Sequence, residues 1–172
     1  MNIEMVVSLI ATDRPGLVRR LSETVSDRSG SWIESSMARL GGEFAGIVRI
    51  SLPKSELAGF ETALDELRAD GITLSVRRDE PIAPLIGQRL DLKVTGSDRP
   101  GIVHEISRAL DERSVSIEDL ETEIFSGSMS GDKLFVAQAR IVLPDGLDMD
   151  EVRGDLEDIA QDIMVDVEFA AH

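Results

Sequence analysis

The sequence predicts an α+β protein with two tandem domains, each with the element order β-α-β-β-α-β. The chain has 172 residues, enough for two small domains of about 80 residues each. The segment Thr12–Val18 recurs almost unchanged as Ser97–Val103, at an offset of 85 residues. Each half also alternates stretches of strand periodicity with stretches of helical periodicity. Together these observations indicate the duplication of one whole domain.

The repeat extends well beyond this segment. Arg28-Ser29 and Trp32 match Arg113-Ser114 and Ile117 at the same offset of 85 residues. Further along, the run from Phe44 to Pro53 matches the run from Phe135 to Pro144 at an offset of 91 residues. The second copy therefore contains an insertion, and we assign it to Ser126–Gly131, which consists mainly of serine and glycine.

The first two elements of each copy are a strand and a helix. Leu90–Thr95 alternates strictly between apolar and polar residues, which is typical of a strand with one wet face, and Met5–Ile10 is its more apolar counterpart. We expect Pro15 and Pro100 in the first turn of the helix that follows. Apolar residues at helical spacing mark these helices: Leu17, Val18, Leu21 and Val25, and Ile102, Val103, Ile106 and Leu110.

Two further strands form a hairpin in each copy. Gly41-Gly42 supplies its turn in the first copy, and the insertion lengthens the same turn in the second. Pro53 and Pro144 end the third strands. Second helices then follow, marked by Leu57, Phe60, Leu64 and Leu67, and by Met149, Val152, Leu156 and Ile159.

The start of the last helix in the second copy and the final strand of each copy complete the β-α-β-β-α-β order. Asp148 and Glu151 have the spacing of a capping pair at the start of that helix. The final strands are Ile72–Val76 and Val165–Phe169. The compact arrangement of this element order is an antiparallel sheet with both helices on one face, the ferredoxin-like fold. We place the domains at 1–78 and 89–172, with a proline-containing linker at 79–88.

Composition and charge narrow the function classes. The formal net charge is −15, of which residues 1–86 contribute −3 and residues 87–172 contribute −12. Nucleic-acid binding needs a basic surface to neutralise phosphates, so we expect no direct nucleic-acid contact. No stretch of 18 apolar residues is present, the N-terminal residues do not resemble a secretion signal, and cysteine is absent. We therefore expect a cytoplasmic protein without a membrane span, a cofactor or a metal.

The repeated Asp-Arg-Pro-Gly segments are the candidate binding loops. Each lies between a strand and a helix, and a helix N-terminus carries unpaired N–H groups that accept carboxylates. Gly16 and Gly101 have no Cβ, so a ligand or a neighbouring strand can approach the backbone closely. The alternative is a well-formed turn that only begins a helix.

In this arrangement the sequence resembles the ACT domain, once in each half. The resemblance implies a regulatory module that binds amino acids where two copies meet, and therefore a homo-oligomer. The residues that match the two ligand loops of the family are Asp13, Arg14, Pro15, Gly16 and Leu17, and Asp98, Arg99, Pro100, Gly101 and Ile102.

A narrower resemblance is carried by the first copy. Its loop, the segment Trp32–Leu40 and the segment Phe44–Arg49 are similar to those of the glycine cleavage system transcriptional repressor family. This implies a stand-alone tandem protein with glycine as effector, acting through a partner transcription factor. The second copy has Ile117–Thr122 in place of Trp32–Met37, so we expect the two loops to differ in affinity.

Two other functions remain open. A protein-interaction scaffold without a ligand would have the same fold. A small phosphatase-like enzyme could hold phosphate with Arg14 or Arg99, but no nucleophile with an adjacent base accompanies them in the sequence. We expect a non-enzymatic protein.

Overall fold

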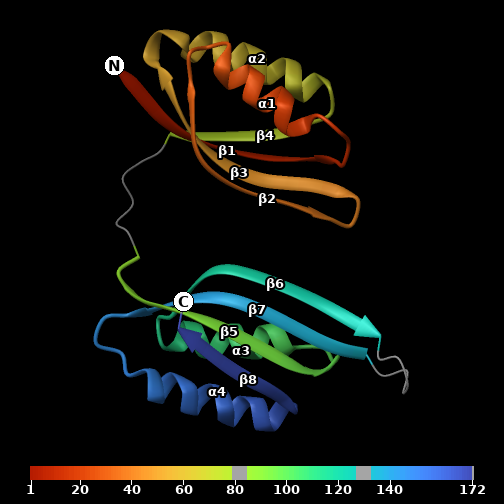
Figure 1. Cartoon of the computed structure of the whole chain (residues 1–172), viewed down its shortest axis with the longest axis vertical. Helices are drawn as coiled ribbons and strands as arrows, with labels where there is room; N and C mark the ends of the chain where they lie inside the picture. The colour runs from red at the N-terminus through yellow and green to blue at the C-terminus, as the bar shows by residue number, and fades with distance from the viewer. Residues whose placement is uncertain (79–84, 127–132, 172) are drawn as a thin grey trace. The chain divides into compact units, whose positions relative to one another are not determined.

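Each half of the chain folds around its own four-stranded antiparallel sheet, with two helices on one face (Figure 1). The computed structural model describes residues 1–78, 85–126 and 133–171. Its internal contacts divide the chain into two units, Met1–Ile82 and Ala83–His172. The predicted fold, two tandem ferredoxin-like domains of the α+β class, is confirmed.

The first unit has the sheet order β2-β3-β1-β4. Its elements are β1 (Asn2–Thr12), α1 (Leu17–Ser26), β2 (Ser31–Leu40), β3 (Glu43–Pro53), a short 3-10 turn η1 (Lys54–Glu56), α2 (Leu57–Ala69) and β4 (Thr73–Arg78).

The second unit repeats this topology with the order β6-β7-β5-β8. Its elements are β5 (Gly87–Ser97), α3 (Ile102–Glu112), β6 (Ser116–Ser126), β7 (Lys133–Pro144), α4 (Met149–Ile163) and β8 (Val165–Ala171).

Strand alternation separates the two faces of each sheet. On β1, Met5, Val7 and Leu9 are buried beneath the helices, whereas the residues between them lie on the opposite face, which we call the open face. Leu90, Leu92 and Val94 do the same on β5. The helices complete each core with the residues that the helical spacing indicated, including Leu21 in α1 and Ile106 in α3.

The two units also share their irregular backbone features. The edge strands β2 and β6 each contain one irregularity in register, between Trp32 and Glu34 and between Ile117 and Asp119. After the first helix of each unit, Ser29 and Ser114 adopt positive φ angles of 54° and 57°. Trp32 packs against the core of the first unit. Residues that are 85 positions apart in the sequence therefore also have matching places in the two folded units.

Three details differ from the sequence prediction. Pro15 and Pro100 precede the helices, which begin at Leu17 and Ile102, because a glycine in the left-handed conformation intervenes. The Asp148 side chain caps α4 by accepting from the Asp150 N–H at 2.9 Å, but Glu151 pairs with Arg113 instead of completing the capping box.

The expected linker at 79–88 is also too long. Gly87 and Gln88 belong to β5, where they pair with Pro144 and Leu143, and residues 79–84 lie outside the described residues. Most of the expected insertion, residues 127–131, lies outside them as well, and Ser126 is the last residue of β6.

Candidate functional site

The two Asp-Arg-Pro-Gly loops have the same backbone geometry. Gly16 has φ 92° and ψ 1°, and Gly101 has φ 98° and ψ −7°. These angles fit the third position of a type II turn, with proline in the second. A side chain at either glycine would meet open space within 4 Å, so the positive φ, rather than crowding, favours glycine there.

Each glycine is also the N-cap of a helix. The Gly16 carbonyl accepts the first helical hydrogen bond from the Arg20 N–H at 2.9 Å, and the Gly101 carbonyl accepts from the Glu105 N–H at 2.9 Å. Glycine offers no capping side chain, and neither helix has a side-chain hydrogen bond at its cap. The N–H groups of the first turn are therefore open to an external acceptor.

The arginine of each loop braces it against the second helix of the same unit. Arg14 Nη2 donates to the Asp70 carbonyl at 2.7 Å, at the end of α2. Arg99 Nε donates to the Ile163 carbonyl at 3.1 Å, at the end of α4. A cation at a helix C-terminus satisfies a carbonyl without an intrahelical partner and interacts favourably with the helix dipole. The arginines therefore hold the loop in place.

The loop aspartates have different surroundings in the two units. Asp13 Oδ2 lies 2.6 Å from Arg39 Nε of β2. The counterpart of Arg39 in the second unit is Ile124, which pairs with Phe135 as Arg39 pairs with Phe44. Asp98 is exposed and has no ion pair among the residues that the structure describes. The second loop therefore presents a carboxylate without a counter-ion.

A hollow of about 270 Å³ opens at the first loop. This is just below the range of roughly 300–1,000 Å³ typical of sites for drug-sized ligands, so its size suits a small molecule. The residues around it come from the loop, the first turns of α1 and the start of β3: Asp13, Arg14, Gly16, Leu17, Val18, Arg19 and Phe44.

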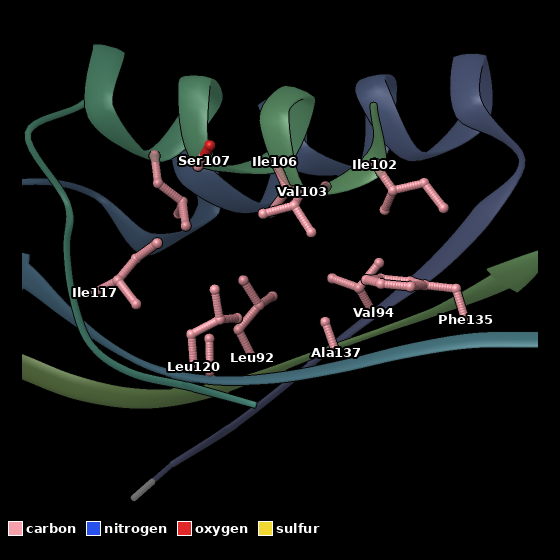
Figure 2. Close-up of a pocket in the computed structure, with 12 residues that line it drawn as sticks. Leu92, Val94, Ile102, Val103, Ile106, Ser107, Ile117, Leu120, Phe135 and Ala137 are labelled. Carbon is pink, nitrogen blue, oxygen red and sulfur yellow. The ribbon is translucent and has the colours of Figure 1, made fainter. Parts of the chain in front are cut away.

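In the second unit a narrower cavity lies under α3 (Figure 2). Val103 and Ile106 of the helix point towards Leu92 and Ala137 of the sheet, and Ser107 is the only polar residue among its walls. Its volume is about 30 Å³, the share of liquid volume that one water molecule occupies (about 30 Å³). It is too small for an amino acid, and because Val103, Ile117 and Leu120 among its walls are exposed, it is an apolar groove that opens to solvent beside α3.

The structure places the sequence-predicted residues in different roles. Asp13, Arg14, Gly16 and Leu17 surround one hollow. Leu17 and Ile102 have buried side chains, so each can offer a ligand only its backbone. Pro15 and Pro100 are exposed in the turns.

Sequence reasoning missed the neighbours that other strands contribute. Arg39 and Phe44 belong to the β2–β3 hairpin, far from the loop in sequence, and Val18 was assigned only to the helix. The pairing of Thr12 with Glu43 brings the hairpin to the loop. The aligned ends of the first and third strands were the signal that could have identified them.

Comparison with known proteins identifies the class. The ACT domain family model matches residues 4–77 and again 88–170. The chain therefore belongs to the ACT domain family and carries two such domains in tandem. A search of curated protein sequences gives no match.

Three solved structures illustrate the similarity. An unknown protein from Galdieria sulphuraria is 31% identical, with a TM-score of 0.89, over 100% of this chain and 99% of that one. A "putative glycine cleavage system transcriptional repressor" is 18% identical, with a TM-score of 0.71, over 100% of this chain and 99% of that one. A formyltetrahydrofolate deformylase from Pseudomonas putida KT2440 is 20% identical, with a TM-score of 0.43, over 49% of this chain and 29% of that one. The second of these similarities shows a shared tandem fold.

Proposed function

We propose that this chain is a non-enzymatic regulatory protein that binds a small amino acid at its Asp-Arg-Pro-Gly loops. The observation that carries this proposal is the pair of uncapped helix N-termini behind Gly16 and Gly101. Each combines unpaired N–H groups with the positive end of a helix dipole, an arrangement suited to a carboxylate. Family membership supports a regulatory role for the fold that holds them.

The two ends of an amino acid need different partners. Its carboxylate would accept from N–H groups of the first helical turn, and its ammonium group would pair with a loop carboxylate. Asp98 is the better candidate for that pairing, because Arg39 already neutralises Asp13. The second loop would therefore bind an amino acid more tightly than the first.

A small effector agrees with the dimensions of the first loop. The hollow there is open and measures about 270 Å³. We propose glycine as the effector, on the resemblance of the first copy to the glycine cleavage system repressors. A pocket distinguishes ligands that differ by one methylene by only about 1–3 kcal/mol, so alanine and serine are the nearest competitors.

The output would pass through a protein partner. The net charge of −15 opposes direct binding to nucleic acid, so control of transcription would require a partner transcription factor. No helix in the described part of the chain is long and apolar enough to cross a membrane. We propose a cytoplasmic homo-oligomer in which ligand binding changes the surface that this partner contacts.

The loop arginines weigh against a phosphatase. A phosphate cradle needs guanidinium groups directed at the ligand, whereas Arg14 and Arg99 donate to helix carbonyls. The ligand-free scaffold differs from the regulator in its response to amino acids. A thermal-shift screen of the full chain against the twenty amino acids separates them.

Binding to the folded state at 100 times the dissociation constant adds about 2.7 kcal/mol of stability. The proposal predicts a rise of several degrees in Tm with one or a few small amino acids. If none of the twenty amino acids raised the Tm, at concentrations that saturate sites with millimolar dissociation constants, the ligand-free scaffold would be the better account.

A further inference from the structure

The open faces of the two sheets differ sharply in polarity. In the first unit, the middle of this face is free of charge on all four strands. Its residues, which we call the uncharged belt, are Ser8, Ile10, Ser36, Ala38, Ala45, Ile47, Thr73 and Ser75. Ile10 and Ile47 are 46% and 53% exposed. Charged residues occur only towards the two ends of the face.

The second unit provides an internal comparison, because its strand register assigns a counterpart to each position. Ser8 corresponds to Lys93 on β5. On β6, Ser36 and Ala38 correspond to Glu121 and Glu123. Ser75 corresponds to Glu168 on β8, opposite Lys93. The same fold thus keeps one open face charged and the other uncharged.

This contrast indicates that the first face is covered. A sheet with one solvated face alternates apolar and polar residues, as β5 does, whereas a strand buried on both faces is apolar throughout. The run Met5–Ile10 on β1 is apolar except at Ser8 and so is closer to the second pattern, yet the described residues leave Ile10 and Ile47 exposed. Adjacent exposed apolar side chains on a sheet commonly mark an interaction surface.

The charge pattern also selects the partner. The charged open face of the second unit surrounds a hollow of about 520 Å³ lined by Asp91, Lys93, Glu121 and Glu168, among others. Packing it against isoleucines would desolvate carboxylates without providing them with partners. Two copies of the uncharged belt can pack together without desolvating any carboxylate. Among the described sheet faces, this belt is the one with that property. Beside the belt, Arg49 lies 2.6 Å from Glu4 and 3.7 Å from Glu34, and Arg77 of β4 lies in the same row of the sheet.

We infer that the first unit dimerises through its open face, with a second copy of this chain packed sheet against sheet. Such sheets pack about 10 Å apart with interdigitating side chains. From strand and residue spacings the face measures about 25 by 19 Å. Two copies would then bury roughly 1,000 Å², the lower limit for a specific interface, which fits a weak and reversible dimer. The inference does not rest on amino-acid binding.

Sedimentation velocity of the full chain without ligand tests this inference. The wild type should show a reversible monomer–dimer equilibrium at micromolar concentration. Ile47→Gln introduces the residue that the second unit has at this position, Gln138, on an exposed strand position that tolerates it. Each dimer loses two isoleucines, so the dissociation constant should rise at least tenfold, about 1.4 kcal/mol or more.

A matched control is Ile124→Gln, which removes an isoleucine of similar exposure (51%) on β6. It should leave the dissociation constant unchanged. Circular dichroism and urea unfolding would establish that both variants fold. The inference would be overturned if the wild type stayed monomeric at all accessible concentrations. It would also be overturned if Ile47→Gln dimerised with the same dissociation constant as the wild type.

Cross-linking locates the interface independently, because the chain has no cysteine. Ser8→Cys should form covalent dimers with a bismaleimide of about 10 Å, the distance between packed sheets. Lys93→Cys, at the matching position of the second unit, should not. Dimers that cross-link through Lys93→Cys and not through Ser8→Cys would assign the interface to the other face and contradict the proposal.

Discussion

At the scale of single residues, the loop arginine is a positioning residue. Arg99 spans from the second loop to the end of α4, and Arg14 spans from the first loop to the end of α2. The turn between strand and helix is thereby fixed at both sides: by the left-handed glycine on one and by the second helix on the other. This dual support accounts for an arginine next to the proline in both copies.

Replacing Arg99 with alanine should lower the free energy of unfolding by about 1 kcal/mol, because the Ile163 carbonyl loses its charged donor. Urea unfolding monitored by circular dichroism measures this change. Arg108→Ala removes an exposed arginine whose ion pair among the described residues is with Glu105 one turn away, so its effect should stay within about 0.5 kcal/mol. Equal losses for the two variants would argue against the brace.

The two aspartates should contribute unequally to ligand binding. Asp98→Asn removes the carboxylate that lacks a counter-ion among the described residues, so the affinity of the second loop should fall about tenfold, or 1.4 kcal/mol. Asp13→Asn removes a carboxylate that Arg39 already engages, so it should change affinity less. Titration calorimetry on both variants gives the comparison. A larger effect at Asp13 would assign the stronger site to the first loop.

At the scale of elements, the second unit has a gap under its first helix, α3, where it carries a smaller side chain than the first unit has at the matching position. Ala139 lines the cavity beneath α3, and its counterpart in the first unit, Val48, is fully buried. The two additional methyl groups of a valine at position 139 would be in contact with apolar walls. The gap therefore reflects divergence of the copies rather than a ligand site.

Ala139→Val should consequently stabilise the chain. Filling about 30 Å³ of cavity at about 24 cal/mol per Å³ gives a gain of about 0.7 kcal/mol. Thermal and urea unfolding would measure it. Ala137→Val, on the same strand and the same wall of the cavity, serves as a second fill. Destabilisation by both variants would mean that the gap cannot accept a methyl group.

Periodicity and the repeat were enough to predict the elements, but not their ends. Apolar spacing identified α1 and α3 because Leu21 and Ile106 face the core. It could not place Pro15 outside the helix, because that depends on the φ angle of Gly16. Likewise, Gly87 reads as linker until its pairing with Pro144 is known. Contacts between distant segments, such as Asp13 with Arg39, leave no local pattern in the sequence.

At the scale of the whole molecule, duplication gave two copies with the same topology and different surfaces. The loops retain the same glycine conformation in both copies. The open faces and the charges beside the loops have diverged, and the second half carries most of the net negative charge. Under the proposed function, the retained loops would bind the effector and the diverged surfaces would contact protein partners.

The most direct test of amino-acid sensing is titration calorimetry of the full chain with the amino acid that gives the largest thermal shift. The double variant Gly16→Ala/Gly101→Ala strains both loops, whereas Gly146→Ala places a comparable strain at a turn with φ 84° and open space. The account predicts saturable binding by the wild type and by the Gly146→Ala control, with binding lost in the loop pair. Binding by the loop pair as tight as that of the wild type would contradict it.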